Sequence, residues 1–532
     1  MTVTPAELAR QVARRRTFAI ISHPDAGKTT LTEKLLLYGG AIQRAGSVKA
    51  KGSGSHATSD WMELEQKRGI SITSSALQFE YLGHCINLLD TPGHQDFSED
   101  TYRTLVAADS ALMLIDGGKG VETQTIKLFK VCRDRGIPIV TVVNKMDRPS
   151  RAPLDLLDEV EKVLGITVVP LTWPIGSGED FLGVYELATK EVHVFDRTAH
   201  NAQRAGVRVT GPDDPMLRER LGDAAHDQLV DSLGLVETAA EPFDRERFLH
   251  GKQSPMFFAS ALTNFGVENI LRRFIELCPC PGPLATLDGE IPPTAPFFSG
   301  FVYKIAANMD KQHRDRIAFL RVSSGRFERG MEATHVRLGR SVRMSHPHRF
   351  FGQERVSIED AWPGDVIGLI NPGMFRVGDV VSAGPKLEVR NFPRFAPEIF
   401  AQVRAKDPSM SKGFGKGLAQ LGEEGVVQVF WPRTGPREPV LGAVGELQLE
   451  VFQWRLENEY NVQIVMQRKP YTRARWMHHV TDDLIELLPM VVRDESGRPV
   501  ALFSSDFEID YALERYKGLE LLDAPPSEET KA

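Results

Sequence analysis

The chain has no long apolar run. None of its 532 residues lies in a stretch that approaches the length of a membrane-spanning helix. The first sixteen residues are polar and end in Arg14, Arg15 and Arg16, so they lack the apolar core of a secretory signal. Hydrophobic residues make up 42% of the chain and charged residues 25%, which is typical of a globular protein. We therefore predict a cytoplasmic protein without a membrane partner.

Cysteine is also scarce, with four in the whole chain. Cys85 and Cys132 lie in apolar strand and helix patterns, which favours core packing. Cys278 and Cys280 flank one proline, and this spacing fits no zinc-site template. We predict reduced thiols with a structural role.

An excess of positive charge is missing too. The net charge of −7 argues against a free-standing nucleic-acid binder, and we expect no DNA partner. Basic patches at 14–16, 311–316 and 404–416 leave a ribosome partner open, because local charge can dominate a contact. A solvated surface is nevertheless the expected role of each patch taken alone.

The most informative segment that is present runs from Ser22 to Thr30. It lies between an apolar run and a helical pattern, which is the layout of a phosphate-binding loop. Backbone amides of such a loop and the N-terminus of the following helix attract phosphate. Lys28 is expected to reach the outer phosphates, and the Thr29 hydroxyl to ligate Mg²⁺. The predicted contacts are Ser22, His23, Pro24, Asp25, Ala26, Gly27, Lys28 and Thr29.

A second motif, Asn144-Lys145-Met146-Asp147, follows an apolar run that reads as a buried parallel strand. An Asp here can accept from two neighbouring N–H donors on one edge of guanine, and adenine has no such pair. A wrong base would leave that acceptor without a partner. A plain strand-end turn is the alternative, but the position behind a phosphate loop favours a guanine site.

A third motif is Asp90-Thr91-Pro92-Gly93-His94, which begins at the end of a predicted strand. The Asp90 carboxylate there can hold Mg²⁺ through a water, and the Gly93 amide can sense the third phosphate. His94 then lies close to the place of an attacking water, and we assign it the catalytic role. The lone loop histidines His23, His56 and His84 are expected to be solvated.

Two further elements carry weaker signals. Ser71, in a segment that follows a long polar stretch, can complete the Mg²⁺ shell when the third phosphate is present, as in an order–disorder switch. A plain surface loop is the alternative. Ser260 and Ala261 follow another apolar run, and their backbone can contact the guanine carbonyl.

The order of patterns along the chain predicts a multidomain α/β protein. Residues 1–282 alternate strands and helices, with helices expected at 28–38, 97–108, 122–135 and 153–164, which indicates a mostly parallel sheet. The motifs fall at strand ends, where such sheets bind nucleotides. Residues from about 172 to 252 form a predicted inserted subdomain. A Pro- and Gly-rich linker at 280–296 precedes a β-barrel domain, 283–390, and an α+β domain, 391–532.

Together the motifs resemble those of the translational GTPases. Within that superfamily the chain is similar to the bacterial class II release factors, the release factor three family. Stretches that carry this resemblance include 17–25, 59–63, 96–104, 305–315, 422–425 and 428–430, and they thin out after about Arg475. The resemblance implies a GTP- and GDP-binding domain, a β-barrel domain and a third α+β domain, without the two C-terminal domains of elongation factor G.

The resemblance also implies a function. Members hydrolyse GTP on the 70S ribosome and promote dissociation of class I release factors after the peptide has left, with a large-subunit RNA loop orienting His94. Ile70 and Pro24 match the apolar pair that gates His94. Contact with class I factors is expected to be indirect, and the free protein to be monomeric.

Three alternatives stay open at this stage. One is an elongation-type or ribosome-protection GTPase, and another is a GTP-dependent assembly module without relevant hydrolysis. A small-molecule kinase is the last, but it does not explain 144–147. The sequence does not decide relative GDP and GTP affinity, the preferred class I factor, the nucleotide state on ribosome entry or the role of the inserted subdomain.

Overall fold

A computed structural model describes most of the chain: residues 3–40, 65, 72–194, 207–212, 214–307, 316–351, 354–371, 373–389, 396–433, 438–478, 482–488 and 490–525. Predicted residues His56, Ile70 and Ser71 and the basic patch at 311–315 lie outside these ranges. Within them, no helix has both the length and the apolar character needed to cross a membrane.

The N-terminal sheet has seven strands in the order β2-β3-β1-β4-β5-β11-β6. Every neighbouring pair is parallel except β2 and β3, which confirms the predicted mostly parallel α/β sheet. Every residue of β4, β5 and β11 is buried, because helices cover both faces of a parallel sheet. The strands are β1 (Arg15–Ser22), β2 (Ser75–Tyr81), β3 (His84–Asp90), β4 (Ser110–Asp116), β5 (Ile139–Asn144), β6 (Thr167–Pro170) and β11 (Gln253–Phe258).

Four of the helices around this sheet lie where the periodicity predicts them. The predicted helices at 28–38 and 153–164 have the observed bounds, and those at 97–108 and 122–135 are shorter at both ends. The helix from Pro153 to Leu164 is well delimited, because Pro153 favours its first turn and Gly165 takes the left-handed conformation after its end. The helices are α1 (Pro5–Ala13), α2 (Lys28–Tyr38), η1 (Gln95–Phe97), α4 (Ser98–Val106), α5 (Thr123–Asp134), α6 (Pro153–Leu164), α9 (Arg245–Leu249) and α10 (Val267–Leu277).

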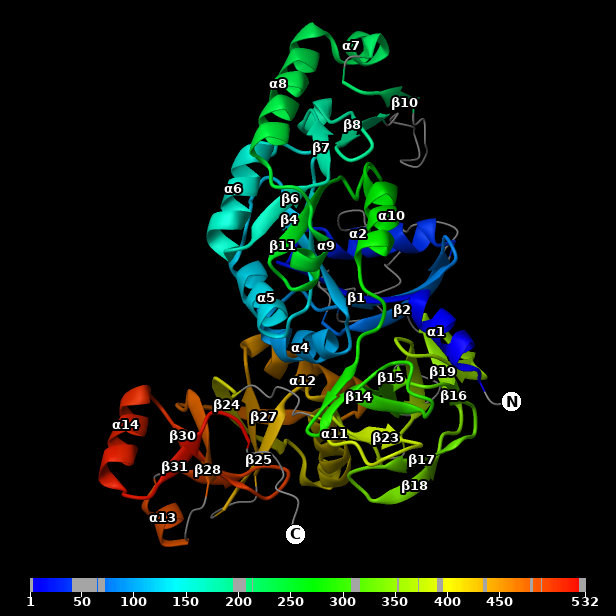
Figure 1. Ribbon diagram of the computed structural model, residues 1–532. Helices are drawn as coiled ribbons and strands as arrows, with labels where there is room; N and C mark the ends of the chain where they lie inside the picture. The colour runs from blue at the N-terminus through cyan, green and yellow to red at the C-terminus, as the bar shows by residue number, and fades with distance from the viewer. Residues whose placement is uncertain are drawn as a thin grey trace.

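Between β6 and β11 the chain forms a separate antiparallel sheet in the order β10-β9-β8-β7, at the top of Figure 1. Its elements are β7 (Thr172–Ile175), η2 (Gly178–Asp180), β8 (Gly183–Glu186), β9 (Glu191–Val194), β10 (Val207–Thr210), α7 (Pro215–Leu221) and α8 (Asp223–Ala239). Glu186, buried in this sheet, accepts from Arg272 at 2.7 Å and also from Arg273, both on α10. Burial would raise the pKa of Glu186, but the contacts with His193 and the two arginines lower it to about 2.

The predicted linker at 280–296 is not wholly irregular. It contains a two-stranded hairpin of β12 (Leu284–Thr286) and β13 (Gly289–Ile291). The Thr286 hydroxyl donates to the Gly289 carbonyl at 2.7 Å, which helps to close the tight turn. The prediction missed this hairpin because each strand is only three residues long.

The middle region is an all-β unit, as predicted. Its eight-stranded sheet has the order β18-β17-β23-β14-β15-β22-β19-β20, with a small β16–β21 pair beside it. Two long central strands carry most of its core, since β14 is buried throughout and β15 nearly so. The strands are β14 (Ser299–Ala307), β15 (Arg316–Ser324), β16 (Phe327–Glu328), β17 (Glu332–His335), β18 (Arg340–Arg343), β19 (Pro347–Phe351), β20 (Glu354–Ser357), β21 (Asp360–Ala361), β22 (Val366–Ile370) and β23 (Val380–Ser382).

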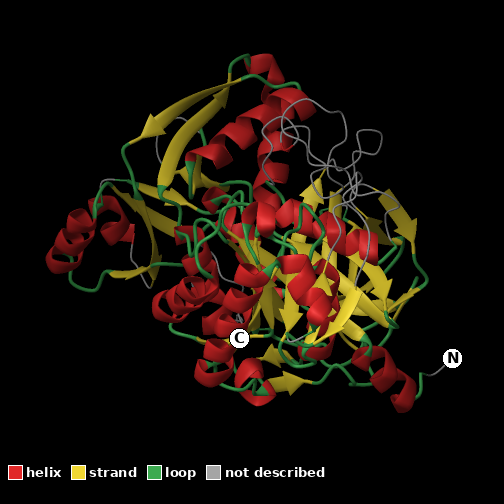
Figure 2. Cartoon of the chain, turned by 90° about the horizontal axis from the view of Figure 1, so that it is seen from above, coloured by secondary structure: helices red, strands yellow, loops and turns green. Residues whose placement is uncertain are grey.

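The C-terminal region combines an eight-stranded sheet, β27-β24-β26-β25-β29-β30-β28-β31, with four helices and one short η segment. It lies at the lower left of Figure 1. Helices and strands alternate along this region, in agreement with the predicted α+β character. Figure 2 distinguishes the helices and strands of the whole molecule by colour. The elements are β24 (Ile399–Ala405), η3 (Pro408–Met410), α11 (Ser411–Glu424), β25 (Gln428–Pro432), β26 (Val440–Ala443), α12 (Glu446–Glu459), β27 (Ile464–Lys469), β28 (Arg473–His478), α13 (Asp482–Leu487), β29 (Val491–Arg493), β30 (Pro499–Phe503), α14 (Asp506–Arg515) and β31 (Glu520–Leu522).

The boundary between the N-terminal and middle sheets centres on Asp365. This buried carboxylate accepts from Arg15 Nε at 2.9 Å and from Gln78 Nε2 at 2.8 Å. Asp365 directly precedes β22, so these bonds connect the turn before β22 to β1 and β2. The expectation that 14–16 is a solvated patch is therefore wrong for Arg15, which is only 6% exposed. Arg16 is half-buried and donates to the Ile275 carbonyl at 3.0 Å. A short basic run in the sequence does not predict which of its residues has a buried partner. The carboxylate that binds Arg15 is 350 residues away along the chain.

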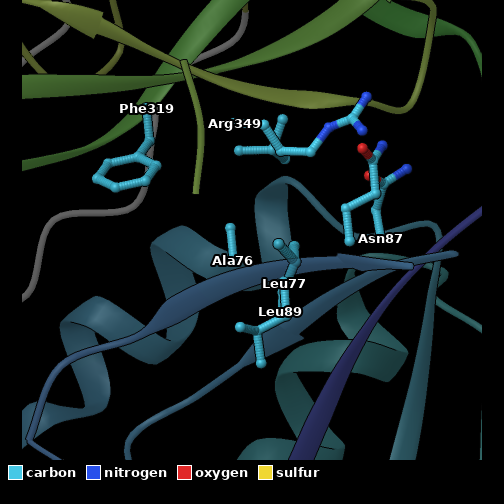
Figure 3. A pocket seen from close by; sticks show the side chains of 8 residues that line it. Ala76, Leu77, Asn87, Leu89, Phe319 and Arg349 are labelled. Carbon is cyan, nitrogen blue, oxygen red and sulfur yellow. The ribbon is translucent and has the colours of Figure 1, made fainter. Parts of the chain in front are cut away.

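A small cavity with both apolar and polar lining residues lies at the same boundary. Figure 3 shows Phe319 and Arg349 of the middle sheet above Ala76, Leu77 and Leu89 of the N-terminal sheet. Its lining is made mostly by β2 and β3 on one side and by β15, β19 and β22 on the other. The two units thus meet at β2, the edge strand of the N-terminal sheet, which lies beside β19 of the middle sheet.

Replacing Asp365 by Ala should destabilise the protein strongly. The substitution leaves the buried Arg15 guanidinium without its carboxylate partner, and breaking a buried pair in this way typically costs about 3–5 kcal/mol. We expect the apparent melting temperature to fall by several degrees in a thermal scan. Asp158→Ala, which removes a solvent-exposed partner of Lys162, is the matched control and should leave it almost unchanged. Equal melting temperatures for the two variants would contradict the role given to Asp365.

Candidate functional site

The predicted motifs meet at one edge of the N-terminal sheet. Ser22 ends β1, Asp90 ends β3 and Asn144 ends β5, and these strands run parallel through β4. The carboxyl ends of parallel strands in one sheet open toward the same side, where α/β proteins bind ligands. The loop after β11, which holds Ser260 and Ala261, joins the same edge.

The segment from Ser22 to Lys28 turns tightly between β1 and α2. The Ala26 amide donates to the His23 carbonyl at 3.3 Å, and Asp25 and Gly27 have φ angles of 65° and 99°. Gly27 is required for a second reason, since a Cβ there would lie 2.3 Å from Asn144 Nδ2. Gly27, the residue before α2, makes no side-chain cap to this helix, and the N-terminus of a helix attracts anions.

Lys28 and Asp90 face each other across the base of this loop. Lys28 Nζ lies 2.7 Å from Asp90 Oδ1, and both side chains are buried. Thr32, one helical turn beyond Lys28, donates to the same carboxylate oxygen at 3.5 Å. The predicted metal ligand Thr29 is the second residue of the same helix and is half-buried. A buried cation beside a buried carboxylate at a helix N-terminus suits phosphate with a divalent cation.

The segment after β3 is anchored at both ends. The Thr91 hydroxyl donates to the Ile20 carbonyl at 2.6 Å, and the Thr101 hydroxyl donates to the Pro92 carbonyl at 3.3 Å. Gly93 approaches the phosphate loop, where a Cβ added to it would lie 3.6 Å from Pro24 Cα. His94 follows, one-third exposed, and its ring caps the start of η1. Its backbone position is therefore fixed relative to the loop.

Asn144 joins two loops of the site. Its Nδ2 donates to the Ala26 carbonyl at 2.9 Å, and its Oδ1 accepts from the Ala261 amide at 2.9 Å. Both donor and acceptor functions of the amide side chain are used, and Asn144 is only 2% exposed. The phosphate loop and the loop after β11 are thereby held at a fixed separation.

Asp147 lies beside Ser260. Ser260 Oγ donates to Asp147 Oδ1 at 2.5 Å and accepts from the Thr263 amide at 3.2 Å. The neighbouring Met146 is fully buried, and its amide donates to the Ala259 carbonyl at 3.2 Å. The weakest sequence signal, Ser260 and Ala261, thus marks residues that contact both Asn144 and Asp147.

The sequence analysis missed Asp116. This residue ends β4, between the strands that end in Ser22 and Asn144, and its Oδ2 lies 2.8 Å from Lys145 Nζ. Burial would raise the pKa of Asp116, but hydrogen bonds from Lys145 and the Gly118 amide outweigh burial and lower it. The signal that could have found it is an Asp directly after the apolar run 111–115, the same position that Asp90 has after β3.

A second contact that the sequence did not predict involves His23 of the phosphate loop. Its Nε2 lies 3.4 Å from Glu122 Oε1, at the start of α5. Glu122 is in turn 3.6 Å from Lys119 Nζ. The loop is therefore supported from α5 as well as from Asn144.

Family models match three consecutive parts of the chain. The model for the elongation factor Tu GTP binding domain matches residues 13–280, and that for elongation factor G domain 2 matches 297–384. The model for the C-terminal domain of the class II release factor RF3 matches residues 390–513. The resemblance therefore extends beyond Arg475, where the sequence motifs thin out.

A solved structure shares the fold. A crystal structure of a protein from Thermus thermophilus superposes with a TM-score of 0.70 at 23% identity, covering 91% of this chain and 72% of that one. At this identity the likeness concerns the fold alone.

Relatives of similar length are much closer in sequence. Peptide chain release factor 3 of Symbiobacterium thermophilum is 53% identical over 522 residues, which cover 96% of this chain and 98% of the relative. Its counterpart from Cyanothece is 52% identical and covers 98% of this chain and 97% of the relative. With a GTP binding domain at its N-terminus and the C-terminal domain of these factors after it, the chain belongs to the peptide chain release factor 3 family, translational GTPases that act in termination.

Proposed function

We propose that this GTPase is stimulated by the 70S ribosome and promotes dissociation of class I release factors, in the cytoplasm, after the peptide has left. The observation that carries the proposal is the match of residues 390–513 to the release factor C-terminal domain. That region distinguishes termination factors from elongation-type GTPases, which share the first two matches. The factor would act on class I factors indirectly, by changing the ribosome that holds them.

We further propose a division into domains that follows the separate sheets. A G domain comprises 1–282, with a subdomain inserted at about 172–252, followed by domain II (283–390) and domain III (391–532). Its support is that each region builds its own sheet and that the three family matches fall within these limits to within one residue, the third beginning at 390.

The proposed nucleotide site uses the loops at the sheet edge. The phosphate loop and Lys28 would hold the phosphates, and Asp147 would read the guanine edge, supported by Asn144 and Ser260. Oxygen ligands suit Mg²⁺, and the buried Asp90 carboxylate beside Lys28 fits such a site. Thr29 and Ser71 would ligate the ion directly, and Asp90 would hold it through a water molecule. When bound, Mg²⁺ would neutralise negative charge on the outer phosphates.

His94 is the proposed catalytic residue. It would position the attacking water once a large-subunit RNA loop orients its ring. No arginine occurs in the phosphate loop, 22–29, or in the segment 90–97, so neither supplies the cationic finger that speeds hydrolysis in other GTPases. Hydrolysis by the free protein should therefore be slow, because the site is completed only on the ribosome.

His94→Ala should separate binding from hydrolysis. We expect unchanged affinity for a fluorescent GTP analogue and a loss of ribosome-stimulated hydrolysis of roughly 10²-fold or more, the usual contribution of a positioned acid–base group. Steady-state phosphate release with and without 70S ribosomes measures it, and His84→Ala, at the start of β3, is the control. Full ribosome-stimulated hydrolysis in His94→Ala would refute the catalytic role of His94. It would favour the alternative of a GTP-dependent assembly module.

Asp147→Asn should change the base preference. The acceptor oxygen that faces the base becomes an amide able to donate, which suits the carbonyl of xanthine better than the donors of guanine. Competition between GDP and XDP for the site, followed by fluorescence, measures the ratio of affinities. Intact guanine selectivity would refute the assignment of Asp147.

The termination function has a direct test. A labelled class I release factor is bound to ribosomes after peptide release, and its dissociation is followed with this protein and GTP, with GDP, and with the His94→Ala variant. GTP with the unmodified protein should accelerate dissociation. Equal rates with and without the protein would contradict the proposal, and support of polypeptide synthesis in place of a translocase would favour the elongation-type alternative.

A further inference from the structure

The residue that follows His94 by two positions links the catalytic segment to domain III. Asp96 Oδ1 lies 3.3 Å from His94 Nδ1. The other carboxylate oxygen of Asp96 accepts from the Leu447 amide at 2.8 Å. Asp96 is 7% exposed, so both contacts are shielded from water.

Leu447 is in the first turn of α12, a helix of 14 residues. Gly445, the residue before this helix, has no side chain to cap it, and the Asp96 carboxylate takes that role from another domain. The approach is very close, since a Cβ at Gly445 would lie 2.0 Å from Asp96 Cγ. The backbone there is extended, with φ −149°, so another residue would fit except for the contact with Asp96.

The same surface of domain III touches the G domain at two other places. Phe97 and Ile72, on either side of the catalytic segment, pack with Leu447 and Val451 of α12 in one apolar cluster. Farther along α4, Arg103 donates to the Glu424 carbonyl at the end of α11, at 3.3 Å. Asp96 is therefore part of a continuous contact between domains.

Two tautomers of the neutral His94 ring are compatible with this geometry. An unprotonated Nδ1 accepts from the Asp96 amide, at 3.3 Å, which leaves the proton on Nε2. A protonated Nδ1 donates to Asp96 Oδ1, also at 3.3 Å, which leaves Nε2 free to accept a proton. The position of the carboxylate decides between these states, and the Leu447 amide holds that carboxylate.

We propose that Asp96 is a positioning residue for GTP hydrolysis, which makes the orientation and the tautomer of His94 depend on the docking of domain III. The chemical signal is the placement of one carboxylate between an imidazole and a helix N-terminus of another domain. The inference rests on the proposed catalytic role of His94. It assigns domain III a part in hydrolysis, in addition to any contact with the ribosome.

A double-mutant cycle tests the proposal from both domains. Asp96→Ala removes the carboxylate, and Gly445→Ala displaces it from domain III. We expect each to lower kcat of ribosome-stimulated hydrolysis roughly tenfold to a hundredfold, as for a misplaced catalytic group, with KM for GTP and affinity for a fluorescent GDP analogue unchanged. The double variant should be no slower than Asp96→Ala, because the three atoms nearest to the new Cβ all belong to the missing carboxylate.

Gly415→Ala, on α11 of domain III, is the matched control, because a Cβ there meets no atom within 4 Å. It should leave kcat unchanged. A wild-type kcat for Asp96→Ala, an effect confined to KM, or multiplying effects in the double variant would each overturn the proposal. Should Gly445→Ala fail to fold, Asp96→Ala alone still decides.

The His94→Ala variant separates this inference from the proposed function. If it retains stimulated hydrolysis, the catalytic role of His94 is wrong and the positioning role is wrong with it. If it loses hydrolysis while Asp96→Ala keeps it, His94 is catalytic and only the role of Asp96 is refuted.

Discussion

The site depends on the two hydrogen bonds of the Asn144 side chain. One fixes the phosphate loop through the Ala26 carbonyl, and the other fixes the loop after β11 through the Ala261 amide. These loops follow different strands, and backbone pairing within the sheet does not reach them. A buried amide that satisfies both of its partners holds its geometry firmly, because releasing either partner would leave a buried polar group unpaired. The bond from Ala261 to Asn144 holds the loop after β11 beside Asp147. It therefore keeps Ser260 within hydrogen-bond distance of Asp147.

Several contacts between domains lie close to the segments that flank the nucleotide site. Lys304 of domain II donates to the Ser74 hydroxyl at 2.8 Å, and Ser74 in turn donates through its amide to Asp100. Asp96 and Arg103 make the contacts with domain III described above. A change in the segment between β3 and α4 would therefore alter the contact with domain III directly, through Asp96. Such coupling suits a GTPase whose nucleotide state must be sensed at a distance, because a segment beside the nucleotide site also contacts another domain.

Much of the fold and the site follows from the sequence alone. Parallel strands read as continuous apolar runs, and the helix at 153–164 carries both a starting proline and a terminating glycine. Asp116 directly follows an apolar run and was overlooked, whereas the roles of Arg15 and Glu186 were beyond such reasoning. Each owes its role to a partner distant along the chain or in another element, and neither periodicity nor composition reports on these pairings. The hairpin at 284–291 was missed for another reason, since three-residue strands are too short for alternation to show.

The sequence by itself determined the order of strands and helices, the guanine-type nucleotide motifs and the family, because local patterning and motif spacing are properties of a linear chain. Only the tertiary structure decided what supports those motifs: the Asn144 link, the Lys145–Asp116 pair and the contact of Asp96 with domain III. Asp96 shows the reason most clearly. Its partner amide belongs to Leu447, 351 residues away, and only the docking of domain III brings that amide within 2.8 Å.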